Sequence, residues 1–208
     1  MIATGKAEPY RTSGGEAAFL MRIIAGKFRG RRLKSPPSLE TRPTSDRLRE
    51  TLFNILAPRL GGACFLDLCA GSGAIGIEAL SRGASHVTFV DRSRKMYALI
   101  ETNLKLLEVE GDTVEVASKE ALDFLRRRIK SDDAPFDVIF FDPPYTMDYE
   151  EVLGYVGAHA ERLLAEDGVV IVEHHKKKKL AEEFGHLKRY RVLKQGDSEL
   201  SFYARQAA

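Results

Sequence analysis

The chain has 208 residues, 44% of them hydrophobic and 30% charged, and its formal net charge is +2. This composition is ordinary for a globular protein of one domain with a proper core. No apolar run approaches the roughly 18 residues of a membrane span, and residues 1–20 lack the apolar centre of a signal peptide. These features argue against a membrane-spanning or secreted chain, and we expect a cytoplasmic protein.

The small net charge hides an uneven distribution. Residues 21–50 contain nine Lys or Arg against three Asp or Glu, and residues 173–194 contain eight against three. Two basic segments suggest a polyanionic partner, although the lysine run at 176–179 is equally typical of a solvated surface. Residues 1–20 are small and polar, so we expect a flexible extension there, with the folded part beginning at Met21.

A short basic strand or hairpin is the first expected element. Ile23, Ile24 and Phe28 can form it, and Pro36 and Pro37 end it, because proline has no N–H to donate to a strand ladder.

A helix is expected next. Apolar residues recur from Leu48 to Leu56 at i, i+4, i+7 and i+8, which places them on one helical face. Thr44 or Ser45 is the expected N-cap, and Pro58 together with residues 61–62, both glycine, is expected to end the helix.

The rest of the chain alternates between apolar strands and helical stretches. We expect strands at 64–68, 86–91, 114–117, 138–141 and 168–173, and helices at 74–82, 93–107, 121–130 and 148–164. Such alternation predicts βαβ units and a mostly parallel sheet, that is, an α/β fold. Two alternating runs then flank Gly196 and Asp197, as in a hairpin whose last strand enters antiparallel at or near the sheet edge.

The end of the first core strand carries a glycine-rich turn. Gly71, Gly73 and Gly76 satisfy G-x-G-x-x-G at the start of a helix, where glycines let the backbone approach a ligand closely. Asp91 ends the next strand about 20 residues later and suits a ribose hydroxyl pair. Asp67 lies inside the first strand, where a buried carboxylate needs a partner and can face a positive ligand, although bracing the loop would explain it too.

These residues predict an adenosine-containing cofactor. A dinucleotide would place its pyrophosphate on the helix N-terminus, whereas S-adenosylmethionine carries a sulfonium and an ammonium and no phosphate. Carboxylates at three strand ends, Asp67, Asp91 and Asp142, favour the cationic cofactor.

The stretch "FDVIFFDPPY" ends another buried strand with a carboxylate on a rigid turn. Asp142 and a carbonyl directed by Pro143 and Pro144 can each accept one N–H of an exocyclic amino group and aim the nitrogen lone pair at a methyl group. Tyr145 offers a flat face on which an extruded base can stack. A plain loop after a strand would also contain Asp and Pro.

Four stretches, "TRPTSDRLRETLFNIL", "DLCAGSGAIGIEALSRGA", "FVDRS" and "FDVIFFDPPY", together resemble the RsmD-type methyltransferases, which methylate a guanine N2 of small-subunit (16S) ribosomal RNA in bacteria. The resemblance runs from about Met21 to Ala204. It implies a class I methyltransferase fold, Rossmann-like, with S-adenosylmethionine as cofactor. It also implies a division into an extension at 1–20, a basic RNA-binding segment with its helix at 21–60, and a methyltransferase domain at 61–208.

The resemblance also assigns roles to residues. The guanine would be held by Asp142, Pro143, Pro144 and Tyr145. The cofactor would be bound by Asp67, Ala70, Gly71, Ser72, Gly73, Asp91, Arg92, Glu120, Ala121 and Asp142. The RNA-facing surface would be formed by Arg22, Lys27, Arg29, Arg31, Arg32, Lys34, Arg42 and Arg47. A helix-surface charge is an equal explanation for Arg47. We expect ribosomal RNA as partner, within a small-subunit particle or assembly intermediate, and a monomeric enzyme.

Several other chemistries find little support. Cys64 and Cys69 have neither metal-ligand spacing nor a disulfide framework, and the histidines make no convincing metal set, so no metal is expected. Ser72 and Ser118 lack a partnered base. Three alternatives stay open: an adenine-N6 methyltransferase acting on DNA or RNA, a nicotinamide-dependent oxidoreductase, and a non-catalytic RNA-binding factor.

Overall fold

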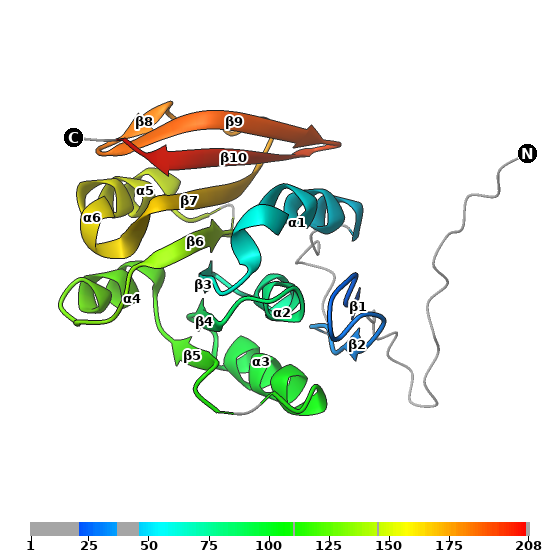
Figure 1. Ribbon diagram of the computed structural model, residues 1–208. Helices are drawn as coiled ribbons and strands as arrows, with labels where there is room; N and C mark the ends of the chain where they lie inside the picture. Colours follow the sequence, from blue (N-terminus) through cyan, green and yellow to red (C-terminus); the bar gives the residue numbers. More distant parts are fainter. Residues whose placement is uncertain (1–20, 37–45, 110, 145, 207–208) are drawn as a thin grey trace, which may run out of the picture.

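The computed structural model of the chain describes residues 21–36, 46–109, 111–144 and 146–206. Its centre is an eight-stranded sheet with the order β5-β4-β3-β6-β7-β10-β9-β8 (Figure 1). The first five of these strands run parallel, and β10, β9 and β8 continue the sheet antiparallel. The strands are β3 (Cys64–Leu68), β4 (His86–Asp91), β5 (Val114–Ser118), β6 (Phe136–Phe141), β7 (Leu164–His175), β8 (Glu183–Phe184), β9 (Leu187–Gln195) and β10 (Ser198–Arg205).

Helices cover both faces of this sheet, as its apolar strands require. The helices are α1 (Asp46–Leu60), α2 (Ala74–Ser81), α3 (Arg94–Leu106), α4 (Ala121–Arg128), α5 (Tyr149–Ala158) and α6 (Ala160–Leu163). Alternate residues of the strands belong to two separate cores. One core holds Phe65 and Phe140 together with apolar residues of α1, α2 and α3. The other holds Leu66 and Phe141 with apolar residues of α4, α5 and α6.

The predicted α/β architecture is therefore confirmed, with some boundaries shifted. The helix expected to end with Pro58 and the glycines at 61–62 ends at Leu60, so Pro58 lies in its last turn and the two glycines follow it directly. The expected N-cap, Thr44 or Ser45, lies outside the described residues.

The helix expected at 148–164 is broken at His159. There the backbone turns to φ −120°, and the ring stacks on Tyr155 and bonds the Tyr155 carbonyl through Nδ1 at 2.9 Å. A polar side chain that takes up a helix carbonyl offers the backbone an alternative to continuing the helix.

The C-terminal hairpin forms as expected around Gly196 and Asp197. Its second strand does not lie at the edge, however. β10 pairs with β7 on one side and with β9 on the other, and the two-residue strand β8 forms the edge. Among the described helices, each is too short or too polar to span a bilayer.

The N-terminal basic segment forms a small hairpin of its own. β1 (Met21–Arg22) pairs antiparallel with β2 (Arg32–Leu33), and both strands have only two residues. Ile23 and Leu33 are buried in the core that also holds α2 and α3. The expected small hairpin therefore forms, but Ile23, Ile24 and Phe28 lie in the loop that joins β1 to β2 and not in its strands.

Two buried polar residues of α2 hold this loop. Glu78, with no exposed surface, accepts the N–H groups of Ile24 at 2.8 Å and Ala25 at 3.0 Å, and its charge is balanced by Arg82 at 2.7 Å. The Ser81 hydroxyl accepts the Phe28 N–H at 3.0 Å and donates to the Ala25 carbonyl. Bonds to a buried carboxylate are strong, so the basic segment is attached firmly to the C-terminal end of α2.

Gly26 is required at this contact. Its φ is +81°, and a Cβ there would lie 1.8 Å from the Ser81 carbonyl oxygen. Gly30, in the same loop, has φ +80° but open space around its Cβ position.

We therefore expect Gly26→Ala to expose the loop to trypsin and to lower the free energy of unfolding. Gly30→Ala should cost only the left-handed backbone strain of about 1–2 kcal/mol. Limited proteolysis at the loop's lysine and arginine residues and urea unfolding measure the difference. Equal effects of the two substitutions would show that the Ser81 contact does not fix the loop.

Candidate active site

The candidate site lies at the carboxyl edge of the parallel strands, where the strand order reverses. The chain proceeds outward from β3 through β4 to β5 and then returns to pair β6 with the other side of β3. In open α/β sheets ligands bind at such a switch point, beyond the carboxyl ends of the strands. The loops that follow β3 and β6 therefore face the same crevice.

Carboxylates gather at this edge on one face. Asp67 lies two residues after Phe65, and Asp142 lies two residues after Phe140, and both phenylalanines belong to the core beneath α1, α2 and α3. Glu173 in β7 lies one residue past Val172, which pairs with Phe141, so Glu173 is level with Asp142. Because strand side chains alternate, these three carboxylates extend the face that α1, α2 and α3 cover.

The loop after β3 is shaped for close approach. Gly71 and Gly73 have φ of +55° and +78°, and Cys69 has φ +69°. A Cβ at Gly76 would lie 2.3 Å from the Phe89 ring, so this glycine serves the packing of α2 on the sheet. A Cβ at Gly71 would meet nothing within 4 Å, so this glycine borders open space where a ligand can come close.

Asp67 fixes the position of this loop. The side chain is 2% exposed, and its Oδ2 accepts the Gly76 N–H in α2 at 2.8 Å. Burial raises the pKa of the Asp67 carboxyl to about 8, and the nearby charge of Asp91 adds to the increase, while the bond from Gly76 opposes it. A cationic group in the crevice would favour the charged carboxylate.

Asp91 braces the same loop from β4. Its Oδ2 accepts the Gly71 N–H at 2.9 Å, and its Oδ1 accepts the Ser93 N–H at 2.8 Å. Ser93 is the N-cap of α3. Each carboxylate oxygen keeps a second acceptor position, so Asp91 can hold the backbone and still bind a hydroxyl pair.

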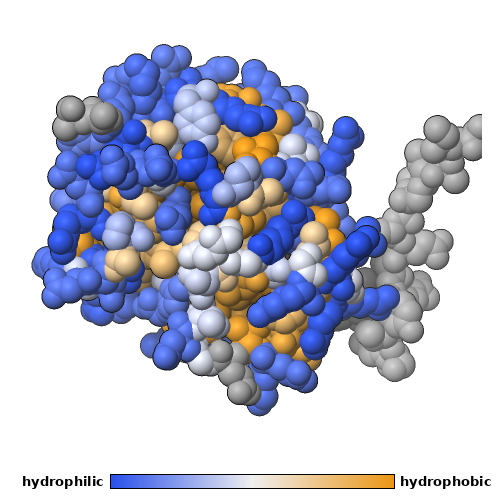
Figure 2. Space-filling model, viewed as in Figure 1, coloured by the Kyte–Doolittle hydropathy of each residue, from blue (hydrophilic) through white to orange (hydrophobic). Residues whose placement is uncertain are grey.

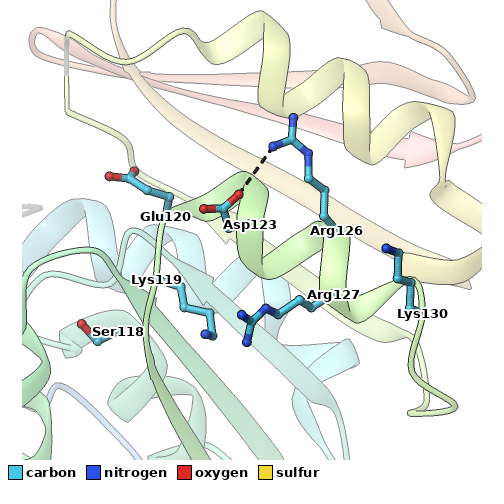
Figure 3. A pocket seen from close by; sticks show the side chains of 7 residues that line it. All are labelled: Ser118, Lys119, Glu120, Asp123, Arg126, Arg127 and Lys130. Atoms are coloured by element: carbon cyan, nitrogen blue, oxygen red, sulfur yellow. Dashed lines mark hydrogen bonds and ion pairs between the residues drawn. The ribbon is translucent and has the colours of Figure 1, made fainter.

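The residues predicted to lie beside the adenine of the cofactor follow β4 and β5. Arg92 and Glu120 form an ion pair at 3.6 Å, with both side chains more than half exposed. Ala121 is buried as the first residue of α4. A charged pocket opens beside them, and Figure 3 shows its lining residues: Ser118, Lys119, Glu120, Asp123, Arg126, Arg127 and Lys130.

The turn after β6 presents Asp142. Its N–H points at the Leu68 carbonyl at 3.4 Å, which ties the turn to the end of β3. Burial raises the pKa of Asp142 well above its usual range, and the charges of Glu173 and Asp67 raise it further. Tyr145 lies outside the described residues, so its stacking role stays a prediction.

The Pro143 carbonyl has a partner that the sequence analysis missed. The hydroxyl of Tyr149, which is 1% exposed at the start of α5, donates to this oxygen at 3.2 Å. The Lys178 ammonium lies 5.0 Å from the centre of the Tyr149 ring. Pro143 itself is buried, while Pro144 is exposed and its carbonyl accepts the Met147 N–H at 2.9 Å. The turn is therefore held at both prolines.

Glu173 was also missed, although it carries the signal that identified Asp142. Both carboxylates directly follow an apolar strand run, and both are beside one another at the same edge. Cys69 lies among these carboxylates, and burial raises the pKa of its thiol, with Asp91 and Asp142 adding to the increase. Within the described part of the chain, no group of His, Cys, Asp and Glu is placed to hold a metal ion.

The predicted RNA-facing cations do not all lie free on the surface. Arg22 pairs with Asp46 at 3.4 Å, and Arg31 donates to the Leu106 carbonyl at the end of α3. The remaining cations of the segment are exposed and pair with no carboxylate among the described residues: Lys27, Arg29, Arg32 and Lys34. Figure 2 shows a strongly hydrophilic surface on the side of β1 and β2.

The helix cations differ from one another as well. Arg47 is exposed at the start of α1, and Arg42 lies outside the described residues. Arg49, two residues past Arg47, is 1% exposed and is structural, because its Nη2 bonds the Arg22 carbonyl at 3.0 Å and Asp46 at 2.7 Å.

This fold, with its glycine loop and carboxylates at the strand-order reversal, is that of the class I S-adenosylmethionine-dependent methyltransferases. Residues 21–204 match the model of the family described as conserved hypothetical protein 95, and the chain belongs to this family. The match confirms the RsmD-type resemblance seen in the motifs.

Relatives and a solved structure agree with the family match. The chain is 37% identical over 187 residues to a Bacillus subtilis protein named "Putative rRNA methyltransferase YlbH", covering 89% of this chain and 100% of that one. It is 42% identical over 131 residues to the Haemophilus influenzae "Ribosomal RNA small subunit methyltransferase D", covering 63% and 67%. The structure titled "Putative methyltransferase yhhF from Escherichia coli" superposes with a TM-score of 0.77 at 32% identity, over 91% of this chain and 99% of that one.

The pKa of Asp67 predicts how stability depends on pH. The folded protein holds a proton on this carboxyl up to about pH 8, whereas the unfolded chain releases it near the ordinary value of 3.8. The stabilisation is complete below pH 4 and is lost as the pH rises towards 8, at up to roughly 1.4 kcal/mol per pH unit. Urea unfolding of Asp67→Asn between pH 5 and 8 should give a flatter profile than wild type, and parallel profiles would contradict the prediction.

Proposed function

We propose that the protein transfers a methyl group from S-adenosylmethionine to the exocyclic N2 amino group of a guanine in small-subunit (16S) ribosomal RNA. The observation that carries the proposal is the position of Asp142 at the reversal of the strand order, where its N–H bonds the end of β3 at the start of the glycine loop. The names of the relatives support ribosomal RNA as the substrate class.

The residues around the glycine loop fit this cofactor. When bound, S-adenosylmethionine supplies an electrophilic methyl group on a positively charged sulfur. Asp67, with the loop residues Ala70, Gly71, Ser72 and Gly73, would hold its methionine part. Burial and the charge of Asp91 raise the pKa of Asp67, and burial and the charges of Glu173 and Asp67 raise the pKa of Asp142, so this edge favours a cation and disfavours a pyrophosphate.

The outer strand ends would hold the rest of the cofactor. Asp91 would bind the ribose hydroxyls with the acceptor positions that Gly71 and Ser93 leave open. Arg92, Glu120 and Ala121 would lie beside the adenine, because they follow β4 and β5 at the same edge.

The turn after β6 would orient the guanine. Asp142 accepts one N–H of the amino group, and the Pro143 carbonyl accepts the other through its second lone pair, since Tyr149 occupies the first. Held in this way, the nitrogen lone pair points at the methyl group instead of delocalising into the ring. Asp142 would be placed to receive the proton that N2 loses on methylation, and its raised pKa suits that role.

The basic segment would bring the RNA to this turn. We propose the organisation given by the family resemblance, with residues 21–60 as the RNA-binding part and 61–208 as the methyltransferase domain. Exposed cations of the segment would contact phosphates, which position the RNA without reading its sequence. A ribosomal substrate places the protein in the cytoplasm, and one site in one chain is sufficient for the reaction.

The proposal is tested by methyl transfer from labelled S-adenosylmethionine to small-subunit particles stripped of modifications, followed by nucleoside analysis. We expect label in N2-methylguanosine alone. Label in N6-methyladenosine would keep the chemistry of Asp142 but overturn the substrate. Stabilisation by NADH and not by S-adenosylhomocysteine would overturn the enzyme class.

Asp142→Asn is the control variant for that assay. The amide keeps the shape of the side chain but cannot take the proton and offers one acceptor in place of two, so methyl transfer should fall by at least 100-fold. Binding of S-adenosylhomocysteine should change little. Full activity of this variant would contradict the proposed role of Asp142.

The RNA-binding role of the basic segment predicts a change in salt dependence. Replacing Lys27, Arg29 and Arg32 with Gln should weaken particle binding and flatten the plot of log affinity against log salt by roughly 0.7–0.9 for each phosphate that the variant no longer neutralises. Equilibrium binding at several salt concentrations measures this. The matched control replaces three cations on the opposite face, Arg126, Arg127 and Lys130, and should keep the wild-type slope. A flattening of the slope by the control alone would place the RNA on that face instead.

A further inference from the structure

Asn103 is a buried amide that touches two separate functional segments. It lies in α3 with no exposed surface. Its Oδ1 accepts the Lys34 N–H at 2.8 Å, and its Nδ2 donates to the Lys34 carbonyl at 3.1 Å and to the Ser72 carbonyl at 3.0 Å. The Lys34 N–H can only donate, so it fixes which end of the amide faces which partner.

The two partners belong to the two halves of the proposed reaction. Lys34 directly follows β2 in the basic segment, and its side chain is exposed. Ser72 lies between Gly71 and Gly73 in the loop predicted to hold the cofactor, and it is nearly buried. One side chain therefore bonds the backbone of the RNA-facing segment and the backbone of the cofactor loop.

α3 supports this arrangement with a second contact. The Ile100 side chain, three residues before Asn103, would lie only 3.2 Å from a Cβ at Gly73, so α3 packs directly against the glycine loop. A movement of the glycine loop towards α3 is thus opposed by packing on Ile100, and a movement away from α3 by the Asn103 amide.

The basic segment has a second attachment, which does not contact the glycine loop. Glu78 and Ser81 hold residues 24–28 near the C-terminal end of α2, whereas Asn103 holds Lys34 near the N-terminal end. Figure 1 shows β1 and β2 lying beside α2 and α3. Of these two attachments, the one through Asn103 joins the segment to the site.

We propose that Asn103 is a positioning residue that couples the basic segment to the cofactor loop, so that RNA binding and cofactor binding strengthen one another. The inference rests on the proposed function. Buried backbone groups must keep their hydrogen bonds, so a shift of Lys34 displaces the amide and with it the Ser72 carbonyl. Coupling between two sites is reciprocal, so each ligand raises the affinity for the other by the same factor.

The coupling is measured with labelled S-adenosylhomocysteine, which binds without reacting. Its Kd is determined by equilibrium filtration with the full chain alone and with saturating unmodified small-subunit particles. We expect the particles to lower the Kd about tenfold in the wild type, within the usual range of such couplings. In Asn103→Ala the ratio of the two Kd values should fall to about one. A wild-type ratio of one, or an unchanged ratio in Asn103→Ala, would overturn the proposal.

Ser81→Ala is the matched control. It removes the hydroxyl bonds at the remote attachment of the same segment and leaves Asn103, Lys34 and Ser72 in place. Particle binding should weaken, yet the ratio of Kd values should stay at the wild-type level. A ratio that falls to one in this control would show that docking of the segment in general, and not Asn103, carries the coupling.

A measurement on the wild type avoids the risk that Asn103→Ala does not fold. S-adenosylhomocysteine should slow hydrogen exchange at the Lys34 amide, which bonds Asn103, and leave the Phe28 amide, which bonds Ser81, unchanged. Equal responses at the two amides would overturn the proposal. Particles that bind neither wild type nor variants would instead reject the proposed RNA substrate, so the two failures are distinguishable.

Discussion

The bond from the Gly76 N–H to the buried Asp67 carboxyl is the contact on which the site depends. It joins the end of β3 to the first turn of α2, so the glycine loop between them must follow a tight path over the edge of the sheet. Asp91 holds the same loop from β4, and Leu68 accepts the Asp142 N–H from the other side. β3 and β4 thus fix the glycine loop around a buried carboxyl, and the turn after β6 is tied to the start of that loop. A site of this kind is preorganised, because its polar groups are held in place before a ligand arrives.

The basic segment must also be held against α2 and α3, although it has no large core of its own. Two-residue strands provide few ladder bonds, so the segment depends on polar contacts with α2 and α3. Buried Glu78 and Asn103 supply these contacts through backbone groups, which leaves most of the segment's cationic side chains exposed. The cations are therefore presented by a rigid backbone while remaining available for phosphates.

Much of the fold can be predicted from the sequence, because buried parallel strands are continuous apolar runs. β6 contains such a run at 138–141, β3 and β4 are apolar apart from Asp67, Thr88 and the ends of β4, and Asp142 stands out because two prolines follow it. Glu173 likewise follows an apolar run, but no proline follows it and the strand continues to His175, so it stands out less than Asp142. The Asn103 contacts could not be predicted, since its partners lie 69 and 31 residues away and only the packing of α3 brings them together. At His159 the sequence pattern misleads in the other direction, because the ring bonds the Tyr155 carbonyl and the helix expected to continue to residue 164 is interrupted.

The order of strands also has a consequence for how the enzyme is made. β10 follows every other strand in the sequence, yet it lies between β7 and β9 in the sheet. During synthesis, β7 can bond β6 on one side but has no neighbour on the other until Ser198–Arg205 has left the ribosome. The glycine loop and the Asp142 turn are translated much earlier, but the sheet that supports them is completed last. Until β10 has formed, β7 therefore presents an open sheet edge to which another strand can bond.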